Sequence, residues 1–124
     1  MKSIDPLLNR RYDTRQYHCV HFVIDAAKYL FERDYSNSFI GLTGAVDSAL
    51  NTSRQTMLKN KRLKKPINGC IVLMTSLMNQ SHVGLFYCGR VLHLTESGVY
   101  FQEIRSLKHH YFRFRYYEAT HLSE

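Results

Sequence analysis

One cysteine and one distant histidine have the types and surroundings of a catalytic pair. Cys19 stands where a polar stretch gives way to apolar residues at helical spacing, and His82 lies in a segment typical of a β-strand. The unpaired N–H groups at a helix start favour the thiolate form of cysteine, and a neighbouring imidazolium favours it further. Because the thiolate is the nucleophile, the sequence predicts a small cysteine hydrolase. We expect Cys19 and His82 to converge in a groove that solvent can reach.

The other cysteines lack such a setting. Cys70 lies in the apolar run 70–74 and is expected to be a small buried side chain, while Cys88 lies near a turn with no base beside it. Three cysteines cannot form a complete disulfide set, and neither a Cys-x-x-Cys pair nor a metal-binding histidine motif occurs. The sequence therefore predicts no metal and no other cofactor. Three histidines of the basic C-terminal stretch are expected at the surface: His109, His110 and His121.

The composition is typical of one globular domain that spans residues 1–124. Hydrophobic residues make up 44% of the chain, and no repeat or Pro/Gly/Ser-rich linker divides it. The N-terminus leads into polar residues rather than an apolar secretory segment, and no run approaches the ~20 apolar residues that span a bilayer. We therefore expect synthesis in the cytoplasm without a signal peptide, and no membrane partner. The net charge of +7 implies an anionic partner, such as nucleic acid, an acidic glycan wall or an acidic protein.

Hydrophobic periodicity predicts helices in the first half of the chain and strands in the second, an α+β layout. One helix is expected from Cys19 to about residue 33, and a second at 45–59 with Thr43 as its cap. The basic run 59–65 is interpreted as the solvated end of that second helix. An antiparallel meander of about five strands is expected at 70–77, 82–88, 91–96, 99–105 and 111–117. The last strand is predicted to have an apolar face (Phe112, Phe114, Tyr116) and a basic face (Arg113, Arg115, Tyr117).

Three motifs in this order resemble those of the NlpC-type cell-wall cysteine peptidases, a papain-like family. Members read Tyr-Asp-Cys-Ser-Gly-Phe-Val at the nucleophile, then Gly-Asp before an apolar strand, then His-Val-Gly-Ile-Tyr. This chain has YHCVHFV at 17–23, NGCIVLM at 68–74 and HVGLFYCGRVLHL at 82–94. The resemblance covers roughly residues 12–96. It implies a papain-like fold, with N-terminal helices packed on the C-terminal sheet.

The resemblance also implies roles for particular residues. Cys19 matches the nucleophile, His82 the general base and His93 the polar residue that orients the imidazole. Tyr17 and His21 are expected to line the substrate site. The implied activity is hydrolysis of peptidoglycan stem peptides in the cell wall or periplasm. Since no signal peptide or wall-binding domain is visible, we expect delivery as part of a phage tail or prophage particle, or through a secretion system.

Departures from the family pattern leave other functions open. His18 replaces the aspartate before the cysteine, Val20 and His21 replace a Ser-Gly pair, and Cys70 replaces the aspartate of the Gly-Asp motif. The fragment Cys-Val-His-Phe also resembles the LRAT-like acyltransferases, but there the histidine strand precedes the cysteine helix, so the order here favours the peptidase. A second hypothesis is an acyltransferase, or a deamidase or secreted toxin acting on host protein. The third, and least favoured, is a non-enzymatic nucleic-acid binder, based on the net charge, the basic run and the arginines of the last strand.

Strand register tests whether His82 and His93 can meet. Residues directly opposite in an antiparallel hairpin share a face, and their numbers sum to a constant. A two-residue loop at 88–89 would place His93 opposite Gly84, on the face of His82 and diagonal to it. A loop one residue later would pair His93 with Phe86, about 13 Å along the strand from His82. Turn chemistry favours the later loop, because Gly-Arg suits a type II′ turn. The family resemblance favours the earlier one, which we predict, with Gly84 leaving room between the rings.

Overall fold

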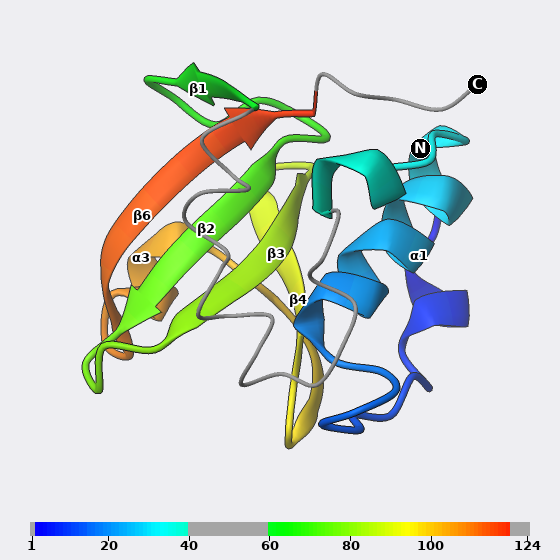
Figure 1. The fold of residues 1–124 in the computed structure, drawn as a ribbon, viewed down its shortest axis with the longest axis horizontal. Helices are drawn as coiled ribbons and strands as arrows, with labels where there is room; N and C mark the ends of the chain where they lie inside the picture. Colours follow the sequence, from blue (N-terminus) through cyan, green and yellow to red (C-terminus); the bar gives the residue numbers. More distant parts are fainter. Residues whose placement is uncertain (1, 40–59, 120–124) are drawn as a thin grey trace.

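The computed structural model describes residues 2–39 and 60–119 (Figure 1). The expected helix at 45–59, its Thr43 cap and His121 lie outside these residues. Within them, one long helix and a six-stranded antiparallel sheet form an α+β fold, which confirms the predicted class. Two short 3₁₀ turns, η1 at Asp5–Leu7 and η2 at Ser36–Phe39, lie before and after the helix in the sequence.

Helix α1 spans Cys19–Phe31 and buries one apolar face. Its buried residues recur at helical spacing, as the sequence predicted, and Cys19 lies in its first turn. The helix ends two residues before the predicted end because Glu32 adopts a left-handed conformation, with φ of 55°. Its N-terminus is fixed by His18, whose side chain accepts a backbone N–H of the first turn.

Six antiparallel strands form one sheet in the order β1-β6-β2-β3-β4-β5. The strands are β1 (Lys61–Leu63), β2 (Ile71–Ser76), β3 (Ser81–Tyr87), β4 (Arg90–Thr95), β5 (Gly98–Gln102) and β6 (Tyr111–Glu118). All five predicted strands are present, although β5 ends early because helix α3 (Ile104–Leu107) occupies the rest of that segment. Strands β2 to β5 form the predicted meander, but β6 crosses back to pair with β2 rather than β5.

The interpretation of the basic run as a helix end is wrong for residues 61–63. These residues form β1, which pairs with β6 at the edge of the sheet, so that Lys61 faces Glu118 and Arg62 faces Tyr117. The Arg62 guanidinium lies over the Tyr117 ring, 5.6 Å from its centre. A strand of three residues is too short to show the alternation of apolar and polar residues that indicates a strand. Its partner lies more than fifty positions later, so the local sequence could not indicate it.

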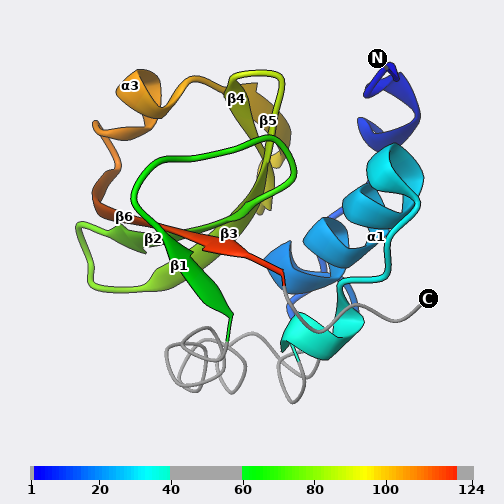
Figure 2. The ribbon, with the colours of Figure 1, turned by 90° about the horizontal axis from the view of Figure 1, so that it is seen from above.

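Helix α1 packs on one face of the sheet, and α3 lies on the other (Figure 2). Alternate residues of β3 divide between the two faces: Val83 and Leu85 join the cluster under α1, whereas Phe86 packs with the cluster under α3. The predicted division of β6 is only partly right. Tyr117 is buried in the α1 cluster rather than lying on a solvated basic face, and Phe112 is exposed although it was expected on the apolar face.

Candidate functional site

The β3–β4 hairpin brings His82 and His93 together. Its two-residue loop consists of Cys88 and Gly89, both at positive φ (50° and 83°), as a type I′ turn requires. The residues that flank this loop pair with each other, so the predicted register is correct. His82 Nε2 and His93 Nδ1 lie 2.9 Å apart, which makes a hydrogen bond between the two rings.

Gly84 permits this approach because it places no side chain between the strands. A Cβ atom at Gly84 would lie 2.6 Å from Val91 Cγ1, 3.1 Å from the Leu92 carbonyl oxygen and 3.2 Å from His93 Cβ. The first of these distances is shorter than real Cβ contacts allow. A side chain at Gly84 would therefore press against β4 beside His93.

A third side chain extends the histidine pair into a chain of hydrogen bonds. His93 Nε2 lies 2.9 Å from Gln102 Oε1, an oxygen that can only accept, so Nε2 carries a proton. In neutral His93 the other nitrogen is then an acceptor, and His82 Nε2 donates to it. His82 Nδ1 is left without a proton, as a general base requires.

Gln102 was missed from the sequence, although the same register arithmetic reaches it. Val91 pairs with Gln102, so Gln102 lies on the face of β5 that corresponds to the face of His93 on β4. The expected strand at 99–105 already included this residue. What was lacking was the position of the β4–β5 loop, which sets the pairing.

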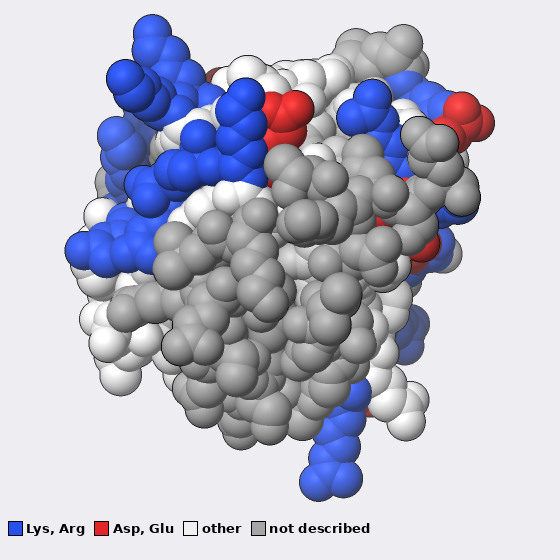
Figure 3. All heavy atoms as spheres, turned by 45° about the horizontal axis from the view of Figure 1, so that its top comes forward, with Lys and Arg blue, Asp and Glu red and all other residues white. Residues whose placement is uncertain are grey.

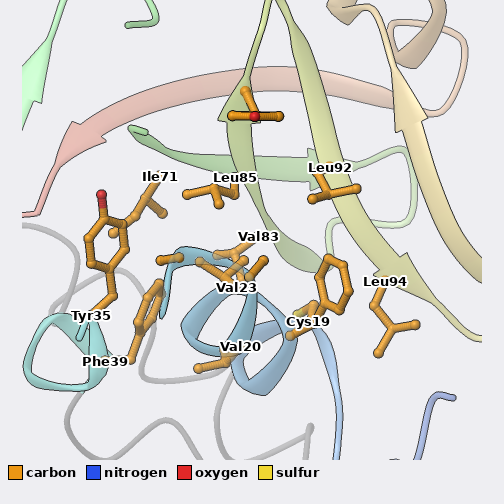
Figure 4. Close-up of a cluster of buried hydrophobic side chains, with 14 of the residues drawn as sticks. Cys19, Val20, Val23, Tyr35, Phe39, Ile71, Val83, Leu85, Leu92 and Leu94 are labelled. Atoms are coloured by element: carbon orange, nitrogen blue, oxygen red, sulfur yellow. The ribbon is translucent and has the colours of Figure 1, made fainter. Parts of the chain in front are cut away.

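The Cys19 sulfur reaches the same end of β3 from helix α1. Pairing between β3 and β4 stops at Leu85 and Leu92, so Val83 lies beyond the last paired position. The backbone N–H groups of Val83 and Val20 lie near the Cys19 sulfur, where they favour its thiolate form. The thiol therefore lies near Val83, within the apolar cluster between α1 and the sheet (Figure 4), whereas His82 shares the strand face of Phe86. The expected convergence of the Cys19 sulfur and the His82 ring stays a prediction.

Burial keeps this cysteine and histidine uncharged, contrary to the expected thiolate–imidazolium pair in an open groove. Only 1% of Cys19 is exposed, and burial raises the pKa of its thiol to about 11 although the N–H groups around the sulfur oppose that shift. Burial, with a smaller effect of nearby His93, lowers the pKa of His82 to about 3. Desolvation outweighs the partial charge of the helix start. At neutral pH the site holds a thiol and a neutral imidazole.

Tyr111, at the start of β6, packs against His82. Its ring stacks on His82 with ring centres 5.7 Å apart and planes 12° apart. Burial raises the pKa of the Tyr111 hydroxyl, and the charge of a Cys19 thiolate would raise it further, so the hydroxyl keeps its proton. Sequence reasoning missed Tyr111 because it approaches His82 only through the pairing of β6 with β2.

Tyr17 and His21, the predicted substrate-lining residues, support the start of α1. The His18 backbone N–H donates to His21 Nδ1 at 3.1 Å, and His18 Nδ1 accepts a first-turn N–H at 3.3 Å, which forms a reciprocal cap. The Tyr17 hydroxyl donates to Asp25 Oδ2 at 2.7 Å, and its ring stacks on His21. The buried His18 thus fills the capping role for which an aspartate is also suited. The role of Tyr17 and His21 in substrate binding stays a prediction.

The remaining candidate residues lie apart from this site. Cys70 is buried in the cluster under α3, and Cys88 is exposed at the hairpin tip, as predicted. His109 and His110 are exposed, which confirms their expected place at the surface. Within residues 2–39 and 60–119, no group of three or more His, Cys, Asp or Glu side chains is arranged to hold a metal ion. In the same ranges, no helix has the length and apolar character needed to cross a bilayer.

The depressed pKa of His82 predicts acid sensitivity of the fold. In the unfolded chain the imidazole takes up its proton near pH 6.5, whereas in the folded protein it does so only near pH 3. Between these values the unfolded state binds more protons, so the free energy of unfolding falls as pH falls from about 6.5 towards 3. One such proton contributes a slope of about 1.4 kcal/mol per pH unit. Urea unfolding monitored at several pH values measures this slope.

Two variants isolate the His82 contribution to the acid sensitivity. His82→Gln should reduce the slope of the free energy of unfolding against pH by about the contribution of one proton. His109→Gln, at an exposed site, should leave the slope unchanged. Equal slopes for wild type and His82→Gln would contradict the assignment of a neutral His82 with a depressed pKa.

Substitutions at Tyr111 should separate the effect of its ring from that of its hydroxyl. Tyr111→Phe keeps the ring that stacks on His82, so we expect a fall in kcat of less than about tenfold. Tyr111→Leu removes both contacts and is expected to lower kcat further and to broaden the pH–rate profile. The measurement is steady-state kinetics across pH. Equal effects of the two variants would show that the ring does not position His82.

Comparison of the chain with models of known protein families and with curated proteins gives no match.

Proposed function

We propose that the chain is a cysteine hydrolase with a papain-like fold. Cys19 is the nucleophile, His82 the general base and His93 the residue that orients it. The observation that carries this proposal is the hydrogen-bonded chain from Gln102 through His93 to His82, which leaves His82 Nδ1 as a proton acceptor. This series of hydrogen bonds ends at His82, whose neighbour Val83 lies in the same apolar cluster as Cys19.

The proposed substrate is the stem peptide of peptidoglycan, as the order of the three motifs implies. Cys19 Sγ attacks an amide carbonyl carbon while His82 Nδ1 takes the thiol proton. Backbone N–H groups at the start of α1 donate to the oxyanion of the tetrahedral intermediate. His82 passes its proton to the leaving amine as the C–N bond breaks, which leaves a thioester. Water, deprotonated by His82, then hydrolyses the thioester to a carboxylate and restores the thiol.

Two features of the resting site shape this mechanism. Because both groups are neutral, proton transfer accompanies attack rather than preceding it, as for a serine nucleophile. Because the thiol is buried, a substrate reaches it only after the side chains around Cys19 move apart. The protein is therefore proposed to act after such an opening step, in the cell wall, following delivery by a phage particle or a secretion system.

Digestion of purified sacculi tests the function. Wild-type protein should release stem-peptide fragments that mass spectrometry assigns to cleavage of one amide bond. Candidate host proteins incubated in parallel would show a gain of an acyl group, or conversion of an amide to a carboxylate, if the protein is an acyltransferase or a deamidase. Intact sacculi together with a modified host protein would replace the proposed function by that second one.

A further inference from the structure

The pairing of β1 with β6 gathers two basic segments that lie far apart in the sequence. Figure 3 shows Lys and Arg side chains gathered on the side of the molecule where these two strands lie. We define the basic surface as six side chains from β1, the residues after it and β6: Lys61, Arg62, Lys64, Lys65, Arg113 and Arg115. All of them are exposed except Arg115, which is partly buried.

The charge of the basic surface is not neutralised by the described parts of the chain. The ion pairs within residues 2–39 and 60–119 are Arg10–Asp25 and Arg105–Glu103, and neither involves this surface. Glu118, which faces Lys61 across the strands, is the one acidic residue of β1 and β6. Six cations beside one carboxylate produce a positive potential that attracts anions within about 8 Å at physiological salt.

Two of the arginines lie over aromatic rings. Arg62 lies over Tyr117 at 5.6 Å from the ring centre, and Arg113 lies over Phe112 at 6.0 Å. A guanidinium held over a ring has fewer conformations to lose on binding. Paired N–H donors of this kind match the two oxygens of a carboxylate.

We propose that the basic surface is a second contact for the peptidoglycan polymer, where it binds carboxylates of stem peptides other than the one under attack. This inference rests on the proposed function. Strand β6 links the two places: Tyr111 at its start stacks on His82, and Glu118 at its end pairs with β1. Seven residues of strand span about 23 Å. A cross-linked polymer with repeating carboxylates can occupy both places at once, whereas a short soluble peptide cannot.

Sedimentation with purified Gram-negative sacculi tests the binding independently of cleavage, with Cys19→Ala as the background. In that background, a patch variant carries Lys61→Gln, Lys64→Gln, Lys65→Gln and Arg113→Gln. The control variant changes four exposed cations elsewhere and has the same net charge: Arg11→Gln, Lys28→Gln, Arg33→Gln and Lys108→Gln. We expect the patch variant to bind sacculi about tenfold more weakly or worse, as four lost surface charge contacts imply, and the control to keep most of the affinity.

Further experiments identify the chemical group that the basic surface binds. Sacculi whose carboxyl groups have been amidated should lose binding, and added salt should weaken it. With the active enzyme, the patch substitutions should slow digestion of sacculi but leave cleavage of a soluble stem peptide unchanged.

Equal losses of binding in the patch and control variants, or full binding to amidated sacculi, would overturn the proposal. So would tighter binding to duplex DNA that depends on the same four residues. An enzyme that cleaves neither substrate would instead refute the proposed function.

Discussion

Replacing Cys19 with alanine should lower the cleavage of sacculi by at least about 10⁴-fold, because the thioester cannot form without the sulfur. The fold should persist, since the methyl group of alanine stays compatible with helix α1 and only a small buried volume is lost. Fragment release measured by mass spectrometry gives the activity, and thermal unfolding reports the integrity of the fold.

Cys70 provides a matched control for this experiment. It is also 1% exposed, and burial also raises the pKa of its thiol to about 11, but it lies in the cluster under α3. Cys70→Ala should therefore cost a comparable amount of stability and leave cleavage largely intact. Undiminished activity of Cys19→Ala, or an equal loss in both variants, would show that Cys19 is not the nucleophile.

Replacing Gly84 with valine should damage both the fold and the site. The Cβ alone would meet Val91, Leu92 and His93 at 2.6 to 3.2 Å, and the branched side chain adds further overlap. Overpacking of this kind costs about 1–3 kcal/mol, or more where backbone must move. Because β3 and β4 must separate to accept the side chain, the 2.9 Å bond between His82 and His93 should lengthen or break. Urea unfolding measures the loss of stability, and NMR of the imidazole nitrogens reports the bond.

A substitution at Gly89 is the control for the effect of side-chain bulk at Gly84. It has a positive φ of 83°, and a Cβ atom there would meet nothing within 4 Å. Asparagine tolerates the left-handed conformation, so Gly89→Asn should lower stability by less than about 1 kcal/mol and leave the histidine bond unchanged. A Gly84→Val protein as stable as Gly89→Asn would contradict the close approach of the two strands at this point.

The spacing of apolar residues was sufficient to predict helix α1 and the five main strands. Helical and strand periods are local properties of the chain, so each element could be assigned without its neighbours. The meeting of His82 and His93 was also predictable, because a hairpin with a two-residue loop fixes which residues face each other. In this case the resemblance decided the register, since local turn chemistry favoured the wrong loop. The left-handed conformation of Cys88 is tolerated in the resulting turn.

Residues brought in by distant pairings were not predictable in this way. Tyr111 contacts His82 only because β6 returns to β2, and the short strand β1 exists only because β6 offers it an edge. The basic surface depends on the same return of β6. Such pairings join segments many residues apart, and their free energy comes from the assembled sheet rather than from either segment.

The sequence by itself determined the chemical groups of the site, since a thiol at a helix start and two histidines on neighbouring strands follow from local pattern. The tertiary structure alone decided their protonation. Burial in the folded protein raises the pKa of the Cys19 thiol and lowers the pKa of the His82 imidazole, so both groups are neutral at neutral pH. The charge state of a desolvated group depends on everything that surrounds it, and those surroundings exist only when the whole chain has folded.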